Sequence, residues 1–129
     1  MPIVTISILE GNSIEFKNKI HAAIHSALVA AFKIPESDYD QKINEYNRNN
    51  WKIPDGKTDK FISIEMLVFP GRKKETKKKL YEEIIKNLEN IGINRTDTFI
   101  LLIEQPLENW GIRGGIPADE VTLGFKTNI

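Results

Sequence analysis

Residues 2–11 read PIVTISILEG and residues 62–71 read ISIEMLVFPG, two alternating apolar stretches that each end at a glycine. Outward from these stretches, the chain repeats itself at a shift of roughly half its length. Residues 45–53, EYNRNNWKI, match residues 104–112, EQPLENWGI, so both tryptophans of the chain fall in the same register. Self-similarity of this kind is typical of a duplicated supersecondary unit.

Each copy predicts a strand, a helix and a second strand. The first stretch of each copy alternates in the manner of a half-buried strand, and apolar residues then recur at helical spacing. Asn12 and Glu15 have the spacing of a capping box at the start of the first helix. The expected ranges are strands at 3–9, 39–46, 61–69 and 98–104, and helices at about 13–32 and 74–91.

These elements predict one α+β domain over residues 1–129, made of repeat one (2–53), repeat two (61–115) and a C-terminal tail (116–129). Parallel strands joined through a helix need a right-handed crossover, so both helices should cover the same face of a four-stranded mixed sheet. The other face would leave apolar side chains in water in a monomer, which predicts self-association from packing alone. The candidate residues of that face are Ile3, Leu9, Phe61, Leu67 and Phe99.

The composition excludes several classes of protein. Acidic and basic residues balance at 18 each, whereas a nucleic-acid binder usually carries a surplus of lysine and arginine. The chain has no cysteine, so disulfides, thiolate catalysis and cysteine zinc sites are excluded. The start of the chain does not have the pattern of a signal peptide, and no apolar run reaches membrane-spanning length. A cytoplasmic protein without a nucleic-acid or membrane partner is expected.

A chain of two β-α-β units that opens Met-Pro-Ile and continues into Leu-Glu-Gly resembles the tautomerase superfamily. The most specific pieces are the start PIVTISILEG, FPGRKKETKKKLY at 69–81 and ENWGIRGG at 108–115. Short members, such as 4-oxalocrotonate tautomerase, have one unit per chain and form hexamers, whereas long members fuse two units and form trimers. This chain resembles a long member, closest to the malonate semialdehyde decarboxylase and cis-3-chloroacrylic acid dehalogenase type. The resemblance implies a homotrimer that uses no cofactor.

The resemblance makes Pro2 the expected catalytic residue. Removal of Met1, which the small proline ring permits, would leave a secondary amine that titrates far closer to neutrality than a lysine. A low-dielectric pocket and a nearby arginine would lower the pKa of this amine further, so that it could take a proton from the substrate and return it elsewhere. The alternative is that Pro2 only begins a strand, where a missing N–H group is tolerated.

Three further positions are expected to bind a small carboxylate substrate. The resemblance implies that Arg72, at the start of the second helix, holds the carboxylate, and a guanidinium fork at a helix N-terminus suits that task. The second arginine of the related dehalogenase and decarboxylase has no counterpart, because the candidate positions hold Phe69 and Pro70. Trp110 matches an aromatic wall that would dry the pocket, with interface packing as the alternative. Arg113 would either contact a carboxylate or fix a hairpin.

Asp38 follows a proline-containing turn and matches an aspartate that lies beside the proline amine in the decarboxylase-like group. Such a carboxylate would raise the pKa of the amine and favour its cation, with Asp38 orienting Pro2 or activating water. The alternative is a turn or strand-entry cap, which is the role expected for Asp97 in the second copy.

Two other patterns predict no site. His21 and His25 lie four residues apart on a helix and could share a metal ion, but no third ligand motif accompanies them. The lysines of residues 73–79 are expected to form a solvated helix face, with nucleic-acid binding as the weaker alternative. Neither a GxGxxG nor a GxxxxGK[ST] motif occurs, so no nucleotide cofactor is expected.

The preferred function is therefore a cofactor-independent keto–enol tautomerase of small 2-oxo or enol carboxylic acids. Pro2 would move the proton, Arg72 would hold the carboxylate and Trp110 would line the pocket. One alternative is decarboxylation or hydration of a small oxo acid by a cationic Pro2 with Asp38. The other is a non-catalytic oligomeric binder of small acids.

Overall fold

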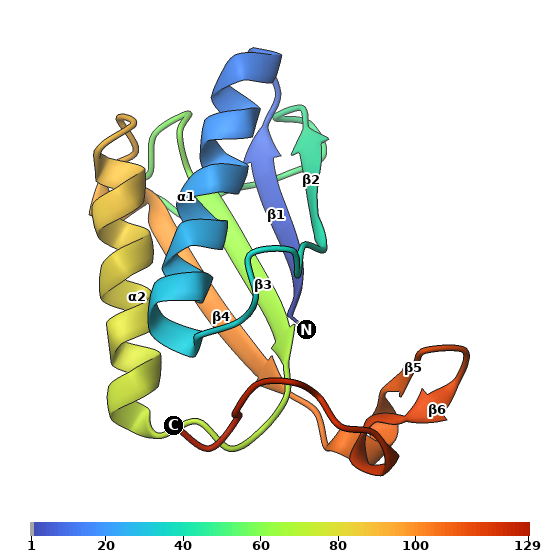
Figure 1. Cartoon of the computed structure of the whole chain (residues 1–129). Helices are drawn as coiled ribbons and strands as arrows, with labels where there is room; N and C mark the ends of the chain where they lie inside the picture. Colours follow the sequence, from blue (N-terminus) through green and yellow to red (C-terminus); the bar gives the residue numbers. More distant parts are fainter. Residues whose placement is uncertain (1) are drawn as a thin grey trace.

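The computed structural model describes residues 2–129 and contains two β-α-β units followed by a small hairpin and a tail. Both helices cover one face of a four-stranded sheet (Figure 1), which confirms the predicted α+β architecture. The main elements are β1 (Ile3–Leu9), α1 (Ile14–Phe32), β2 (Gln41–Tyr46), β3 (Ile62–Val68), α2 (Lys74–Glu89) and β4 (Thr98–Glu104), with β5 (Gly111–Ile112) and β6 (Ile116–Pro117) forming the hairpin.

The sheet has the order β2-β1-β3-β4 and is mixed. Each unit supplies one parallel pair, β1 with β2 and β3 with β4, and the two units join through the antiparallel pair of β1 and β3. Alternate strand residues point toward the helices and form the core with three-to-four-spaced residues of α1 and α2. The fully buried large side chains of this core include Ile6, Ile64, Met66, Ile20, Ile24, Leu28, Leu80, Ile84 and Leu88.

The start of α1 differs from the predicted capping box. Ser13 is the N-cap, and its side-chain oxygen accepts a hydrogen bond from the backbone N–H of Phe16 at 3.0 Å. The Asn12 side chain instead donates to the carbonyl of Leu9 at 2.8 Å, three residues back in the turn after β1. The prediction was wrong by one residue because both Asn and Ser are good N-caps, and the chain uses the first for the turn and the second for the helix.

An ion pair occurs at equivalent places in the two units. Lys17 of α1 contacts Glu45 of β2 at 2.9 Å, and Lys77 of α2 contacts Glu104 of β4 at 2.9 Å. These are positions that the sequence repeat aligns. Half-exposed pairs of this kind add little stability, so their value here is that they show the same helix-to-strand contact in both copies.

The face of the sheet that the helices leave open is apolar near β4. Phe99 is 55% exposed and Leu101 is 42% exposed, and the register places them beside Ser63 and Glu65 of β3 on the side away from the helices. The expectation for this face was wrong at two positions, Leu9 and Phe61, which are buried within the chain. The Phe61 ring packs on Trp51 of the linker between the units, with ring centroids 5.5 Å apart, because the linker folds back over that end of the sheet.

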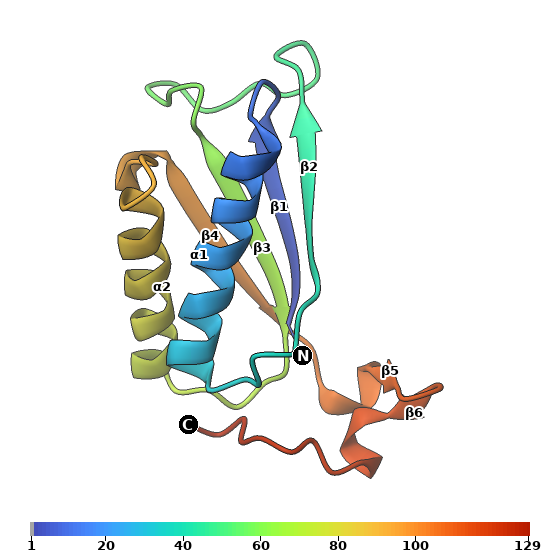
Figure 2. The same ribbon diagram turned by 45° about the horizontal axis from the view of Figure 1, so that its top comes forward.

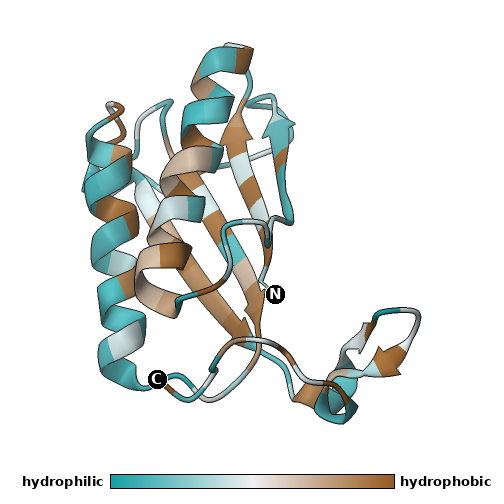
Figure 3. Ribbon diagram, in the orientation of Figure 1, coloured by the Kyte–Doolittle hydropathy of each residue, from teal (hydrophilic) through white to brown (hydrophobic). Residues whose placement is uncertain are grey.

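The chain after β4 runs away from the sheet and then returns. Figure 2 shows the β5–β6 hairpin standing beside the ends of β1 and β3, and the tail passing back under the sheet toward the start of α2. Neither α1 nor α2, the helices described over residues 2–129, is long and apolar enough to cross a membrane. Colouring by hydropathy shows α2 as mostly hydrophilic with hydrophobic bands, and α1 as more hydrophobic in its second half (Figure 3).

Candidate active site

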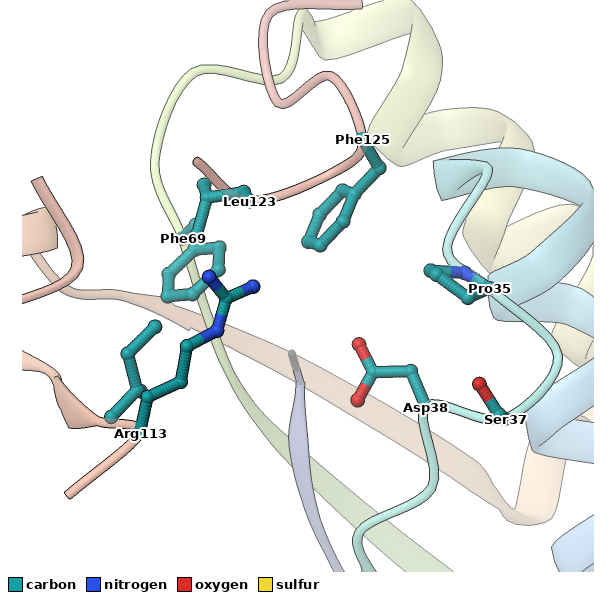
Figure 4. Close-up of a pocket in the computed structure, with 8 residues that line it drawn as sticks. Pro35, Ser37, Asp38, Phe69, Arg113, Leu123 and Phe125 are labelled. Atoms are coloured by element: carbon teal, nitrogen blue, oxygen red, sulfur yellow. The ribbon is translucent and has the colours of Figure 1, made fainter. Parts of the chain in front are cut away.

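A cavity of about 300 Å³ lies where the start of β1 and the end of β3 meet the C-terminal tail. Its wall is assembled from three parts of the chain: the loop between α1 and β2, the end of β3, and the hairpin with the tail (Figure 4). The lining residues are Pro35, Ser37, Asp38, Phe69, Ile112, Arg113, Leu123 and Phe125.

Pro2, the expected catalytic residue, lies immediately before β1 and is not among the residues that line the cavity. The backbone N–H of Val4 donates to the carbonyl of Asp40 at 2.9 Å on one side, and Ile3 is paired with Leu67 on the other. Pro2 is therefore held between the segment that carries Asp38 and the segment that carries Phe69. Its side chain is buried, and in Figure 4 the start of β1 runs toward the cavity between Asp38 and Arg113. Met1, whose removal the catalytic reading of Pro2 requires, lies outside the described residues.

The Asp38 carboxylate points into the cavity from the loop between α1 and β2 (Figure 4). This loop is fastened to α1 by His25, which is 4% exposed. Nε2 of His25 lies 2.8 Å from the carbonyl oxygen of Glu36 and so donates to it, and the His25 ring stacks on Tyr39 with centroids 3.6 Å apart. Because Glu36 and Tyr39 lie on either side of Asp38 in sequence, these contacts hold the loop that carries the Asp38 carboxylate.

His25 therefore has a partner other than His21. The Nδ1 atom of His21 lies 2.9 Å from the side-chain oxygen of Gln41 in β2. The two rings make separate contacts, one to the sheet and one to the loop after α1.

Phe69 forms the apolar wall of the cavity and is itself held from behind. It follows β3, is 1% exposed, and meets the Trp110 ring edge-to-face with centroids 4.8 Å apart. The Trp110 indole N–H donates to the carbonyl of Gln105 at 3.2 Å. Trp110 was expected to line the pocket, but it is not among the lining residues; it fixes the ring that does.

Arg113 stands on the wall opposite Asp38, with its guanidinium turned toward the cavity (Figure 4). It belongs to the tight turn between β5 and β6 and has a φ of 49°, the left-handed region that few L-residues other than Asn and Asp adopt readily. Two glycines with positive φ follow it, Gly114 and Gly115. Both expected roles of Arg113 are thus compatible with its position, since it is a hairpin-turn residue and a lining residue.

Arg72, the expected carboxylate ligand, is 7% exposed and does not line the cavity. One terminal nitrogen donates to the carbonyl of Phe69 at 3.1 Å, and the guanidinium carbon lies 4.4 Å from the centroid of the Phe32 ring. Burial lowers the pKa of Arg72, and the negative charge of Glu104 opposes this shift. Its bond to the carbonyl three residues back repeats the bond that Asn12 makes in the first unit, which is a turn-holding role.

Sequence reasoning found both charged residues of the cavity, Asp38 and Arg113, and missed most of its apolar wall. Leu123 and Phe125 lie in the tail, which has no counterpart in the repeat, so no internal comparison points to them. A signal was present in the alternation of VTLGF at 121–125, where apolar side chains flank a glycine in a segment otherwise too short to form a core.

The site combines one carboxylate, one guanidinium and a mainly apolar surround at the start of β1. A guanidinium can hold a carboxylate group of a ligand, and an apolar wall excludes water and strengthens electrostatic contacts inside. The arrangement suits a small acid with an apolar part.

Comparisons with known proteins identify the family of the chain. A family model described as "Tautomerase enzyme" matches residues 38–113, and a second model with the same description matches residues 2–60. "Probable tautomerase YusQ" of Bacillus subtilis (strain 168) is 29% identical over 121 residues, which cover 89% of this chain and 95% of that protein.

Two solved structures extend the comparison. The structure of FG41 malonate semialdehyde decarboxylase inhibited by 3-bromopropiolate is 26% identical with a TM-score of 0.78, covering 84% of this chain and 86% of that one. Native fused 4-OT has a TM-score of 0.82 over 95% of this chain and 98% of that one, and at 19% identity it shows the shared fold alone.

Proposed function

Because this chain belongs to the tautomerase family, we propose that it is a cofactor-independent tautomerase of small 2-oxo or enol carboxylic acids in which Pro2 carries the proton. The single observation that supports this most is the position of Pro2. It is the residue before β1, between the loop that carries Asp38 and the end of β3, and Asp38 and Phe69 of these two segments both line the cavity.

The symmetry of the two units supports the pairing of Pro2 with Asp38. Asp97, the counterpart of Asp38, is 3% exposed and accepts hydrogen bonds from the backbone N–H of Thr58, at 2.9 Å, and from the Thr58 hydroxyl. Thr58 lies in the segment that leads into β3. Asp38 has the corresponding place before β2 in the first unit, so by this symmetry we expect its carboxylate to face the segment that leads into β1, where Pro2 stands.

In the proposed step, Arg113 holds the carboxylate of an enol acid and the apolar wall covers its carbon chain. The neutral imino nitrogen of Pro2 takes the proton of the enol hydroxyl, and the C–O bond becomes a carbonyl as the electron pair of the C=C bond moves to C3. The resulting Pro2 cation then delivers its proton to C3. The enol becomes the keto acid, and Pro2 returns to its neutral form.

The carboxylate-binding role of Arg72 stays a prediction. Since its guanidinium already donates to the Phe69 carbonyl behind the wall, we expect Arg113 to make the direct contact and Arg72 to add positive potential and hold Phe69. Trp110 acts in the same indirect way, by fixing the Phe69 ring.

A second candidate is decarboxylation or hydration of a small oxo acid. It is favoured by Asp38, which lines the cavity and would stabilise a cationic Pro2, and by the 26% identity to a malonate semialdehyde decarboxylase. In this reading Pro2 stays protonated and Asp38 orients it or activates water.

We further propose that the chain forms a homotrimer. Phe99 and Leu101 leave an apolar strip on the open face of the sheet, and such strips mark association surfaces. Related fused 4-OT proteins of the same fold are trimers.

The test compares wild type, Pro2→Ala and Asp38→Asn as mature full-length chains, with phenylenolpyruvate as substrate. Loss of turnover in Pro2→Ala by about 100-fold or more is expected for a proton carrier. A rate that rises with pH as Pro2 loses its proton supports the tautomerase. A rate that falls as Pro2 loses its proton, together with release of carbon dioxide from malonate semialdehyde, supports the second candidate. Equal rates of wild type and Pro2→Ala on every acid would refute both.

A further inference from the structure

We propose that this site selects monocarboxylates that bear an apolar group of about the size of a benzene ring, and that the C-terminal tail (116–129) provides the selectivity. The inference rests on the location of the site under the proposed function and narrows its substrate class. It excludes dicarboxylates, which the general description of a small enol acid would admit.

The charges of the lining residues favour a ligand with a single carboxylate. Among the residues that line the cavity, Arg113 is the single cation and Asp38 the single anion, and they stand on opposite walls. One carboxylate of a ligand is satisfied at Arg113. A second carboxylate would have to lie against Asp38, where like charges repel, or against the apolar wall, where it would lose its water without gaining a partner.

The other basic residue near the site does not change this balance. Arg72 is 7% exposed, is not among the lining residues, and has its guanidinium over the Phe32 ring with one nitrogen donating to the Phe69 carbonyl. A second ligand carboxylate could reach it only by displacing the groups that leave Arg72 7% exposed.

The tail supplies the apolar half of the cavity. Leu123 and Phe125 line it, and the Phe125 ring lies nearly parallel to that of Phe69, at 16° with centroids 6.2 Å apart. Phe125 packs against both hydrophobic clusters of the chain, and so it ties the tail to the body of the domain. Two facing aromatic rings at the edge of a cavity favour a flat apolar group offset-stacked against them.

The tail is anchored at its far end as well. The carbonyl of Ile129 accepts hydrogen bonds from the backbone N–H of Lys73 at 3.0 Å and from the Thr76 hydroxyl at 2.7 Å, both at the start of α2. The backbone of Thr127 passes so close to Gly71 that a Cβ built on that glycine would lie 3.0 Å from the Thr127 carbonyl oxygen. At the near end, the backbone N–H of Ala118 donates to the Trp110 carbonyl at 2.9 Å. Because residues 118–129 are held at both ends, Leu123 and Phe125 act as a fixed wall.

The volume agrees with this substrate class. A cavity of about 300 Å³ is at the small end of the range for ligand sites. It admits one ring and a short acid chain, and its polar groups are too few to orient a larger polar ligand.

The experiment uses two acids that differ only at one end. Trans-cinnamate and fumarate share an acrylate group, and the first carries a phenyl ring where the second carries another carboxylate. Binding of each to the full-length wild type is measured by isothermal titration calorimetry. We expect cinnamate to bind at least about tenfold more tightly than fumarate.

Variants of the tail test whether Phe125 causes the preference for cinnamate over fumarate. Phe125→Ala and the milder Phe125→Leu should weaken cinnamate binding and leave fumarate unchanged, so that the ratio falls by about three- to tenfold. Phe125→Arg should tighten fumarate binding by adding a second cation. Ile14→Ala, which shortens an apolar side chain that is 75% exposed on α1, is the matched control and should leave the ratio unchanged. Thermal unfolding confirms that each variant is folded.

The outcomes separate this inference from the proposed function. Equal affinity for the two acids, binding of neither, or an unchanged ratio in both Phe125→Ala and Phe125→Leu overturns the selectivity. A clear preference for cinnamate without turnover of phenylenolpyruvate supports the proposed selectivity and refutes the proposed tautomerase activity. Turnover of phenylenolpyruvate and of the dicarboxylate 2-hydroxymuconate at equal kcat/KM supports the tautomerase activity and refutes the selectivity.

Discussion

Replacing Arg113 and Arg72 one at a time distinguishes a residue that binds the substrate from one that supports the wall behind it. Arg113 lines the cavity and is exposed, whereas Arg72 is 7% exposed and bonded to the Phe69 carbonyl. The informative changes are Arg113→Asn and Arg72→Met. Asn tolerates the left-handed backbone at position 113, where φ is 49°, and Met keeps the length of a buried arginine stem.

The expected effect of Arg113→Asn is on substrate binding. A hydrogen bond between charged groups contributes about 1.5–3 kcal/mol, and exposure of Arg113 to water reduces this to about 1–2 kcal/mol. The KM for phenylenolpyruvate should therefore rise about 5- to 30-fold. The free energy of unfolding should change by less than about 0.5 kcal/mol, because the Arg113 side chain is exposed.

The expected effect of Arg72→Met is on stability. The change removes the donor to the Phe69 carbonyl and the guanidinium 4.4 Å from the Phe32 ring, and each loss costs about 1–2 kcal/mol. Burial of the charged guanidinium, which lowers the pKa of Arg72, is itself unfavourable, so its removal offsets part of this loss of stability. A net loss of about 1–2 kcal/mol should lower Tm by about 3–10 °C, with a smaller change in KM than in Arg113→Asn.

Steady-state kinetics and thermal unfolding of both variants and wild type decide the question. If Arg72→Met raises KM at least as much as Arg113→Asn does while leaving Tm unchanged, the division of roles argued from the geometry is refuted. Arg72 would then be the direct ligand, as the family resemblance implied, and Phe69 would have to move to admit it.

Three other changes test the fold around the site. Asp97→Ala should cost about 2–4 kcal/mol in urea unfolding, because the N–H and hydroxyl of Thr58 lose their buried acceptor; a loss below about 0.5 kcal/mol would contradict the clamp. His25→Phe keeps an aromatic ring on Tyr39 but removes the donor to the loop that carries Asp38, so kcat should fall about 3- to 10-fold with unchanged far-ultraviolet circular dichroism, and unaltered kinetics would show that the brace is dispensable. The double change of Phe99 and Leu101 to Ser should shift the sedimentation coefficient to that of a monomer, whereas an unchanged value would place the interface elsewhere.

The fold could be predicted from the sequence because local and long-range patterns agree. Alternating apolar residues define β1 and β3, helical spacing defines α1 and α2, and the repeat around the two tryptophans fixes the element order. The boundaries were within a few residues, and the error at the start of α1 arose where two good N-caps, Asn12 and Ser13, are adjacent. Handedness of the crossover then leaves one arrangement of helices on the sheet.

The candidate site could be predicted only in part, for a physical reason. Asp38 and Arg113 follow or precede strands whose positions the repeat defines, so their meeting at one end of the sheet is foreseeable. Whether Arg72 faces the cavity or the core depends on its χ angles and on Phe32, which no local pattern specifies. Phe125 reaches the site through a tail without regular structure, and its place depends on contacts 53 residues apart in sequence, such as that between Thr76 and Ile129.

The proposed catalysis depends most on a free imino nitrogen of Pro2 that is accessible to the substrate. The most direct test is mass mapping of the purified chain after incubation with 2-oxo-3-pentynoate, an electron-poor alkyne that a neutral amine can attack. The account predicts an N-terminal peptide that begins at Pro2 and carries one equivalent of reagent, with no adduct on the lysines of residues 73–79. An N-terminal peptide that still carries Met1, or an adduct found only elsewhere, would contradict it.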